Sequence, residues 1–268
     1  MNRIFRTKWL ILSRSVVFNV SIIIWLVSII GFPLIIYLMS QNENDVRFDI
    51  LKDAFTFPIV FNTISVLELC IPLHLMSLTI IVLICQEFDF KTYRLHLLNG
   101  SSRFELWLNT LLLTLVLSIF IMLLSFIISF GFGISIDKSI VNLDSIKPFR
   151  WHLILFFQAF AYFNFAITLS LLFRKTGIVI LVYILWFGAI ERTLAQIFNF
   201  NAPFHWYPVG DLMPGKSIEE LSRFKVLEAL GGVYIYHNGY EILKQSFAIL
   251  WCSASILFNY SFYKRLAY

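Results

Sequence analysis

The charged residues Glu68, Glu191 and Arg192 could do chemistry because they interrupt apolar stretches that otherwise carry almost no charge. A charge at mid-membrane costs at least about 2.5–3.5 kcal/mol on insertion scales, so such residues usually face protein or water and find a partner. Glu68 and Arg192 fall at similar depths at about 1.5 Å per helical residue, which allows an ion pair. We expect a structural pair, with substrate contact or gating as the alternative. Glu191 lies about 100° around the helix from Arg192, so it should face a seam with another copy of the chain.

A second polar feature is the charged stretch 86–103, which lies between two of the longest apolar runs. A loop between membrane spans needs only a few residues, but this one has 18, with a helical pattern, a break at Gly100 and a new helix start at Ser102. Large apolar side chains among its charges suit docking on another protein: Phe88, Phe90, Tyr93, Leu95 and Leu98. The alternative is a helix that lies idle on the lipid headgroups.

The other residue types with catalytic or ligating potential show no functional spacing. The five histidines are scattered, and the three cysteines all fall inside apolar runs. The chain has no glycine-rich loop ending in Gly-Lys-Ser/Thr, no HExxH pair and no GxSxG sequence. We therefore expect no catalytic residue, no metal, no bound cofactor and no ATP hydrolysis by this chain. Nucleic acid is not an expected partner, because no basic groove interleaved with aromatic residues is evident.

Composition places the chain among integral membrane proteins. Hydrophobic residues make up 59% of its 268 residues and charged residues 14%, whereas soluble domains have roughly 45–50% and about 25%. Long uncharged runs favour helices, because lipid offers backbone groups no hydrogen-bond partner. We therefore expect an all-α integral membrane protein that forms a single domain over residues 1–268.

Six apolar runs reach the length of about 20 residues that a membrane span needs. We predict spans at about residues 16–39, 58–85, 106–130, 151–173, 178–200 and 245–263. The second run has 28 residues, and its excess can be absorbed by tilt, by extension beyond the bilayer or by a kink at Pro72. Only the short turn 174–177 separates the fourth run from the fifth, so these two should be antiparallel neighbours.

Local patterns predict shorter features next to the spans. Residues 1–15 are basic and amphipathic, with Lys8 able to snorkel among the apolar side chains, and they predict an interfacial helix before the first span. Ser102 and Glu105 have capping-box spacing at the start of the third span. The far end of that span should fray into a loop near residues 131–133.

The largest polar segment, 201–244, should form a loop before the sixth span. Within it Ser217 and Glu220 have capping-box spacing, and two glycines at 231–232 can end a helix. The pattern therefore predicts a helix over 217–230. Its apolar stripe suits packing on the membrane or on a partner.

Basic residues near the ends of the spans predict the orientation. If the N-terminus lies inside, four short inner segments hold 11 of the 21 Lys and Arg residues: 1–15, 86–105, 174–177 and 264–268. Both termini and the 86–105 stretch should then be cytoplasmic, and the 201–244 loop should face outward. We expect a multi-pass protein of the cytoplasmic (inner) membrane, with the net charge of +5 reflecting contact with anionic lipid.

The residues of the 86–103 stretch also carry a resemblance to a known family. In order they are Glu87, Thr92, Arg94, Gly100, Ser102 and Arg103. This sequence resembles the permease subunits of type-2 ABC exporters, which often have an acidic residue at the end of span two, then Thr-x-Arg and Gly-x-Ser-Arg elements. The turn at Arg174 and the pair Ile190-Glu191 look like the family's fifth span, and the similarity extends over about residues 60–195. One departure is Asn109, where many relatives have a lysine.

The resemblance implies that the chain forms half of a translocation pathway. In such exporters a cytoplasmic coupling helix between spans two and three seats in a groove of a separate ATPase subunit. The ATPase-coupling residues implied here are Glu87, Phe88, Lys91, Thr92, Tyr93, Arg94, Gly100, Ser102 and Arg103. The implied partners are a second permease copy or a related permease, and ATPase subunits that bind ATP and Mg. The alternative is a non-transporting scaffold or immunity-type subunit of an ABC-like complex, and the sequence leaves the substrate open.

Overall fold

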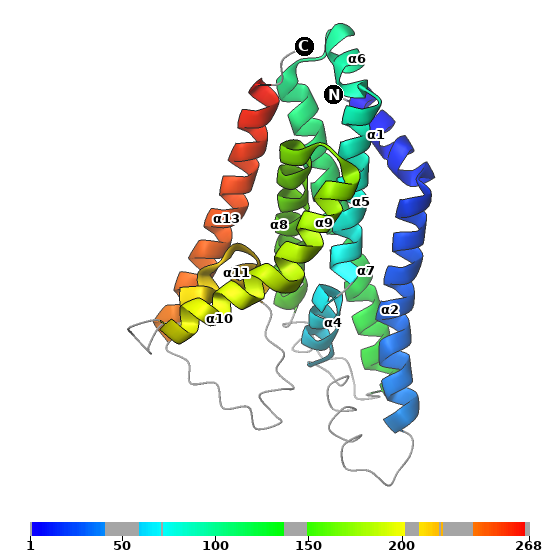
Figure 1. Cartoon of the computed structure of the whole chain (residues 1–268). Helices are drawn as coiled ribbons and strands as arrows, with labels where there is room; N and C mark the ends of the chain where they lie inside the picture. The colour runs from blue at the N-terminus through cyan, green and yellow to red at the C-terminus, as the bar shows by residue number, and fades with distance from the viewer. Residues whose placement is uncertain are drawn as a thin grey trace.

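Helices make up nearly all of the chain that the structure describes. The computed structural model describes residues 2–40, 59–70, 72–136, 149–201, 209–219, 221 and 238–265. Within these ranges there is no strand, and six helical segments are long and apolar enough to cross a membrane. This confirms the all-α class and agrees with the six predicted spans. The start of α1 and the end of α13 lie at the same end of the bundle (Figure 1).

The first two helices are α1, Asn2–Arg14, and α2, Val16–Ser40, with a break at Ser15. The amphipathic pattern of the N-terminal segment thus forms a helix, and α1 packs on α7 and α2. Its buried side chains are Ile4, Lys8 and Leu12, which are spaced by one helical turn. The aliphatic side chain of Ile11 is exposed.

The second apolar run forms two helices, α4, Ile59–Cys70, and α5, Pro72–Asp89. Proline has no backbone N–H and a fixed φ, so it is suited to the first turn of a helix but not to the interior of one. The sequence offered a kink at Pro72 as one way to absorb the excess length; Ile71, between the two helices, lies outside the described residues. The candidate span is α5, which has 18 residues.

A short helix, α6, Thr92–Leu98, precedes the longest helix, α7, Arg103–Ile136. The predicted capping box is confirmed, because Ser102 N–H donates to Glu105 Oε2 at 3.0 Å and Glu105 N–H donates to Ser102 Oγ at 3.1 Å. The expected fraying near 131–133 is wrong, since α7 continues through these residues. A glycine in a helix interior costs only about 0.5–1 kcal/mol, which the neighbouring apolar turns offset.

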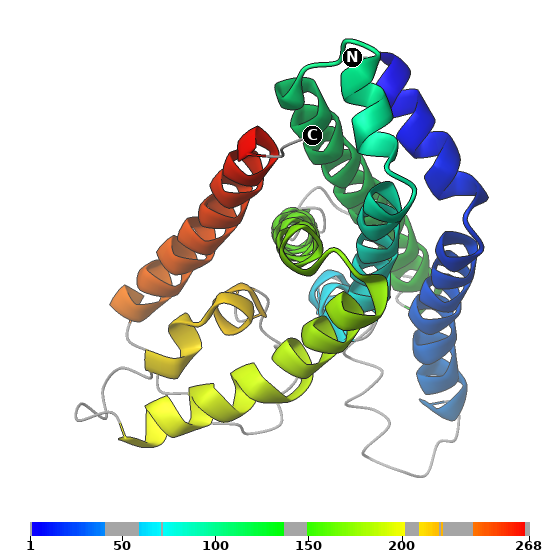
Figure 2. The same cartoon turned by 45° about the horizontal axis from the view of Figure 1, so that its top comes forward.

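The fourth span is α8, Arg150–Phe173, and a two-residue turn joins it to α9, Thr176–Leu185. Arg174 takes a left-handed conformation with φ of 57°, which reverses the chain and makes the two helices neighbours as predicted. The fifth run then passes through a π-helical turn, η2, Trp186–Ile190, into α10, Glu191–Asn201. The sequence predicted a regular span here and missed this turn. As a result α10 lies oblique to α8 (Figures 1 and 2).

The last elements are a 3-10 turn, η3, Val209–Leu212, then α11, Pro214–Glu219, and α13, Asn238–Arg265. The helix predicted to start at Ser217 starts earlier, at Pro214. Ser217 is not an N-cap, because its hydroxyl donates to the Pro214 carbonyl at 3.1 Å inside α11. Glu220 and residues 222–230 of the predicted helix lie outside the described residues. The sixth predicted span lies within α13.

The core is organised around α8, which contacts α5, α7, α13, α4 and α9. Figure 2 shows α8 nearly end-on, with the other helices around it. Polar side chains also join α8 to α13, since Thr168 Oγ1 donates to Asn259 Oδ1 at 3.0 Å and Asn259 Nδ2 donates to the Asn164 carbonyl at 3.2 Å. Such bonds between helices are favourable in lipid, where their groups would otherwise lack partners.

Candidate functional site

The four basic segments that the sequence placed on one side do meet at one end of the bundle, the upper end in Figure 1. Arg103 Nη1 donates to the Lys264 carbonyl at 2.7 Å, which joins the start of α7 to the end of α13. The Arg174 guanidinium lies over the ring of Phe88 at 5.5 Å and over that of Phe262 at 5.4 Å. The α8–α9 turn is therefore tied both to the end of α5 and to α13.

Backbone turns at two positions set α6 apart from the helices beside it. Lys91 has φ of 52° and Gly100 has φ of 84°, and this left-handed region suits glycine. Thr92 Oγ1 donates to the Glu87 carbonyl at 3.3 Å, which holds the start of α6 against the end of α5. The break predicted at Gly100 is therefore where the chain turns toward the capping box of α7.

One side of α6 holds it to the rest of the protein. Tyr93 is buried, and its ring packs on that of Phe88 with the centroids 5.2 Å apart. Arg94 Nε donates to the Tyr93 hydroxyl at 3.0 Å. Phe88 and Tyr93 were expected to anchor a partner protein, but the structure uses Tyr93 to anchor α6 internally.

The other side of α6 is exposed. Phe90 is 72% exposed, Leu95 56% and Leu98 74%. The basic residues Lys91 and Arg94 are exposed beside them. We call these five residues the α6 face. It combines large apolar side chains with cationic ones, the residue types that anchor and orient a docked protein.

A buried ion pair lies behind α6. Lys8 Nζ is 2.8 Å from Glu87 Oε1 and donates to Thr110 Oγ1 at 2.7 Å; the side chains of Lys8 and Glu87 are 2% and 13% exposed. Thr110 Oγ1 is in turn 3.2 Å from the Tyr263 hydroxyl. Burial lowers the pKa of Lys8, but the Glu87 carboxylate more than compensates, so the pKa is raised and the ammonium stays charged.

This ion pair corrects the expectation that Lys8 snorkels from α1. Its ammonium points inward and connects α1 with α5, α7 and α13. Sequence reasoning missed the pair because its partners are 79 residues apart. A signal was present, since Lys8 lies one turn from both Ile4 and Leu12 on the side of α1 that packs inward.

Glu191 and Arg192 lie away from α6, where α10 meets α11 (Figure 1). Glu191 is only 2% exposed, and its Oε1 accepts hydrogen bonds from the backbone N–H groups of Gly215 at 2.5 Å and Lys216 at 2.9 Å. The expectation that Glu191 faces a seam between two copies is wrong, because its carboxylate holds α11 inside its own chain. The π-helical turn before Glu191 changes the direction in which this residue points.

Arg192 has an ion-pair partner that the sequence did not identify. Its Nη2 is 3.6 Å from Glu219 Oε1, and Lys216 Nζ is 3.0 Å from Glu219 Oε2. The Arg192 side chain is 58% exposed, so this contact contributes little by itself. The side chain of Glu68 lies outside the described residues, and the predicted Glu68–Arg192 pair stays a prediction.

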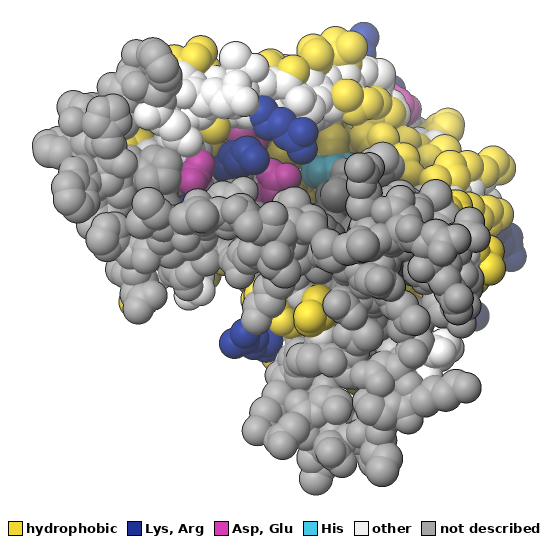
Figure 3. All heavy atoms as spheres, turned by 90° about the horizontal axis from the view of Figure 1, so that it is seen from below, with side chains coloured by type: hydrophobic (Ala, Val, Ile, Leu, Met, Phe, Trp, Pro, Cys, Tyr) yellow, Lys and Arg dark blue, Asp and Glu magenta, His cyan; other side chains and the backbone are white. Residues whose placement is uncertain are grey.

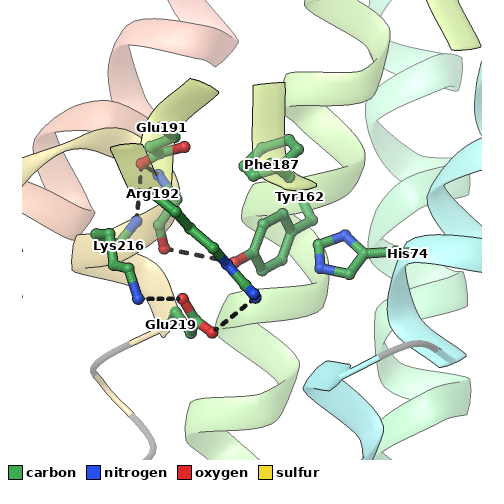
Figure 4. A pocket seen from close by; sticks show the side chains of 8 residues that line it. His74, Tyr162, Phe187, Glu191, Arg192, Lys216 and Glu219 are labelled. Carbon is green, nitrogen blue, oxygen red and sulfur yellow. Dashed lines mark hydrogen bonds and ion pairs between the residues drawn. The ribbon is translucent and has the colours of Figure 1, made fainter. Parts of the chain in front are cut away.

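Aromatic side chains complete a pocket beside these four charged residues. Its walls are His74 at the start of α5, Tyr162 on α8 and Phe187 in the π-helical turn (Figure 4). His74 Nδ1 is 3.0 Å from the Tyr183 hydroxyl, and the Tyr162 hydroxyl donates to the Gly215 carbonyl at 3.4 Å. Sequence reasoning singled out neither these rings nor Lys216 and Glu219, because α5, α8, η2 and α11 are far apart along the chain.

We call this cavity the mixed-charge pocket. It encloses about 310 Å³ of empty space, including its open side. Figure 3 shows the lower face of the molecule, where basic, acidic and histidine side chains gather in a hollow. The pocket therefore places charged groups of both signs against aromatic rings.

Metal binding and known relatives give no further guide to function. Among the residues that the structure describes, no group of three or more His, Cys, Asp or Glu side chains could hold a metal ion. Comparison of the chain with models of protein families, with curated proteins and with solved structures finds no match in any of the three. The geometry of these two sites and the motifs of the 86–103 stretch are therefore the guides to function.

Proposed function

We propose that this chain is the membrane-spanning permease subunit of an ATP-driven exporter of the type-2 ABC class. In this proposal it forms half of a translocation pathway and does not hydrolyse ATP. A separate ATPase subunit binds ATP and Mg, and its movement reaches the spans through the 86–105 stretch. The protein lies in the cytoplasmic membrane with both termini in the cytoplasm.

The observation that carries the proposal is the α6 face. Phe90, Leu95 and Leu98 together expose a large apolar surface next to Lys91 and Arg94. Apolar patches rimmed by charge on the part of a protein that faces water mark interaction sites. Because α6 is held from behind by Tyr93, a force applied to this face is transmitted to the bundle.

The ion pair behind α6 supports the same role. Glu87 ends α5 just before the α6 face, and its carboxylate bonds the Lys8 ammonium from α1. Members of the family that the chain resembles often have a lysine at the position of Asn109. In this chain, Lys8 brings a cation to the adjacent residue, Thr110, from a different helix.

Assembly follows from the proposed role. A single six-span subunit cannot enclose a pathway, so we expect two permease copies, or one with a related permease, and two ATPases. The alternative is a non-transporting scaffold or immunity-type subunit with the same fold. The two differ in their chemistry, because only an exporter hydrolyses ATP faster when its substrate is present.

The proposal is tested by isolating the chain with its partners from its native membrane. We expect a complex that hydrolyses ATP and has the mass of two permeases with two ATPases. Replacing both Leu95 and Leu98 by Glu should reduce ATPase binding at least about tenfold, because buried apolar anchors dominate such interfaces. The matched control is Val209→Glu, an apolar position outside the α6 face that is about as exposed as Leu95, and it should leave binding unchanged.

Three results would count against the proposal. A folded chain that is functional as a lone monomer would contradict the assembly. Equal ATPase binding by the double variant and by the control would show that the α6 face is only a connector on the headgroups. A stable complex whose ATP hydrolysis no solute accelerates would favour the scaffold.

A further inference from the structure

The mixed-charge pocket contains a buried polar atom that the fold does not satisfy. Glu191 Oε1 accepts two backbone hydrogen bonds, whereas Oε2 is buried and makes no hydrogen bond of 3.5 Å or less among the described residues, although the Trp186 side chain lies near enough to interact with the carboxylate. Figure 4 shows this second oxygen turned to the side of Phe187. A buried carboxylate oxygen without a partner is costly, so the inner part of the pocket favours a group that donates to it.

The open side of the pocket has the opposite charge. Arg192 and Lys216 come from α10 and α11, and both contact Glu219, which lies between them. The contact of Arg192 is long, at 3.6 Å, and more than half of its side chain is exposed. An incoming acidic group can therefore bind Arg192 without breaking a strong internal bond.

Aromatic rings connect these two charged regions. The ring centroid of His74 is 5.0 Å from that of Tyr162 and 5.6 Å from that of Phe187, and Tyr162 and Phe187 are 5.2 Å apart. The hydrogen bond to Tyr183 fixes the His74 ring. Aromatic faces attract cations, so these walls favour a cationic group near Glu191.

We propose that the mixed-charge pocket binds a small zwitterion that carries a primary ammonium group and an acidic group. The ammonium binds Glu191 Oε2 between the aromatic walls. The phosphate or carboxylate binds Arg192 and Lys216 at the open side. This assignment does not depend on a partner ATPase, because binding can be measured on this chain alone.

Ligands with a single charge fit the pocket less well. A simple cation has to pass Arg192 and Lys216 and finds no use for them. A simple anion satisfies these two residues but leaves Glu191 without a donor. Only a ligand with both charges is complementary both to Glu191 in the inner part of the pocket and to Arg192 and Lys216 at its open side.

The zwitterion could be a free solute or the headgroup of phosphatidylethanolamine, which share the same chemistry. The probe for both is O-phosphoethanolamine, titrated by calorimetry into the protein in nanodiscs of phosphatidylcholine only. The comparison ligands are ethanolamine, which has only the ammonium group of the probe, and inorganic phosphate, which has only its acidic group. A second set of nanodiscs contains phosphatidylethanolamine. If the headgroup is the natural occupant, the lipid competes and the soluble probe binds more weakly there.

The expected result is that O-phosphoethanolamine binds roughly tenfold to a hundredfold tighter than either comparison ligand, because it makes both charged contacts. Glu191→Gln keeps an acceptor for α11 but loses the charge, and it should weaken binding by a similar factor. Arg192→Gln changes an exposed side chain, so it tests the other contact in a variant that should fold normally. The control is Lys175→Gln, an exposed cation at the far end.

Several outcomes would overturn the proposal. Phosphate binding as tightly as O-phosphoethanolamine would reduce the pocket to an anion site, and ethanolamine binding as tightly would reduce it to a cation site. The buried indole N–H of Trp186 also has no partner among the described residues. If a small rotation joins it to Glu191, folded protein binds no probe, and Trp186→Phe lowers stability without creating or removing a site.

Discussion

Breaking the ion pair between Lys8 and Glu87 should destabilise the bundle, and its two halves should not be equivalent. Glu87→Gln leaves an ammonium group that is 2% exposed, with Thr110 as its remaining partner. Lys8→Met leaves a carboxylate that is 13% exposed and can turn toward water. We therefore expect the glutamate substitution to be the more damaging of the two.

The magnitude follows from the burial of the pair. Removing one partner of a buried ion pair typically costs about 3–5 kcal/mol, which we expect for Glu87→Gln. For Lys8→Met we expect about 1–3 kcal/mol, the cost of leaving a polar group partly unsatisfied. At roughly 2–4 °C per kcal/mol for a chain of this size, the midpoint of thermal unfolding should fall by roughly 6–20 °C and 2–12 °C. The double variant contains neither charge and should recover more than half of the larger loss.

The assay is thermal unfolding of the purified chain in nanodiscs at pH 7, combined as a double-mutant cycle. The pKa of Lys8 is raised in the folded state, so the stabilisation is fully present below the usual lysine pKa of about 10.4 and is lost only as pH rises through the folded value. Neutral pH therefore reports the intact pair. Lys175→Met, at an exposed cation of the same end, is the control and should shift the midpoint little.

Additive losses in the double variant would refute the reasoning, because they would mean that each charge has its own partner. Equal losses from the two single variants would refute the asymmetry that was drawn from their exposure. If Lys8→Met proved the more damaging, the main role of this lysine would be its contact with Thr110 rather than with Glu87.

Glycines provide two further predictions, each measured as a change in the midpoint of thermal unfolding. Gly100→Val should cost about 1–2 kcal/mol or more because φ is 84° there, whereas Gly131→Ala in α7, where a Cβ meets open space, should be neutral or stabilising by up to about 1 kcal/mol; equal effects would contradict the backbone argument. Gly210→Ala should destabilise strongly because its Cβ would collide with the Ala195 carbonyl, while Gly188→Ala in the π-helical turn meets open space and should be tolerated. A tolerated Gly210→Ala would mean that η3 is not held tightly against α10.

Features that local rules determine could be predicted from the sequence. The capping box at Ser102 and Glu105 depends on three residues of spacing and is found where expected. The spans depend on apolar length, and their number agrees with the prediction, but the second candidate span is Pro72–Asp89 and not 58–85. Orientation signals also placed the basic segments together, because the ends of antiparallel spans of similar length must meet.

The features that were missed are those in which tertiary contacts overcome a local rule. Lys8 points inward because Glu87 and Thr110 compensate its desolvation, and nothing in residues 1–15 indicates that partner. Glu191 points inward because a π-helical turn, which has no reliable sequence signature, shifts the register of the fifth span. The mixed-charge pocket combines four separate segments, so no spacing along the chain could reveal it.

The length of α7 has a mechanical consequence. Its 34 residues form a continuous helix of about 51 Å, far longer than the hydrocarbon core of about 30 Å. A rod of that length converts a rotation of about 10° at its first turn into a displacement of about 9 Å at its far end. Toward that end Ser129 bonds His152 at 3.1 Å, in the first turn of the central helix α8. One continuous helix thus connects the capping box beside α6 with the opposite surface of the protein.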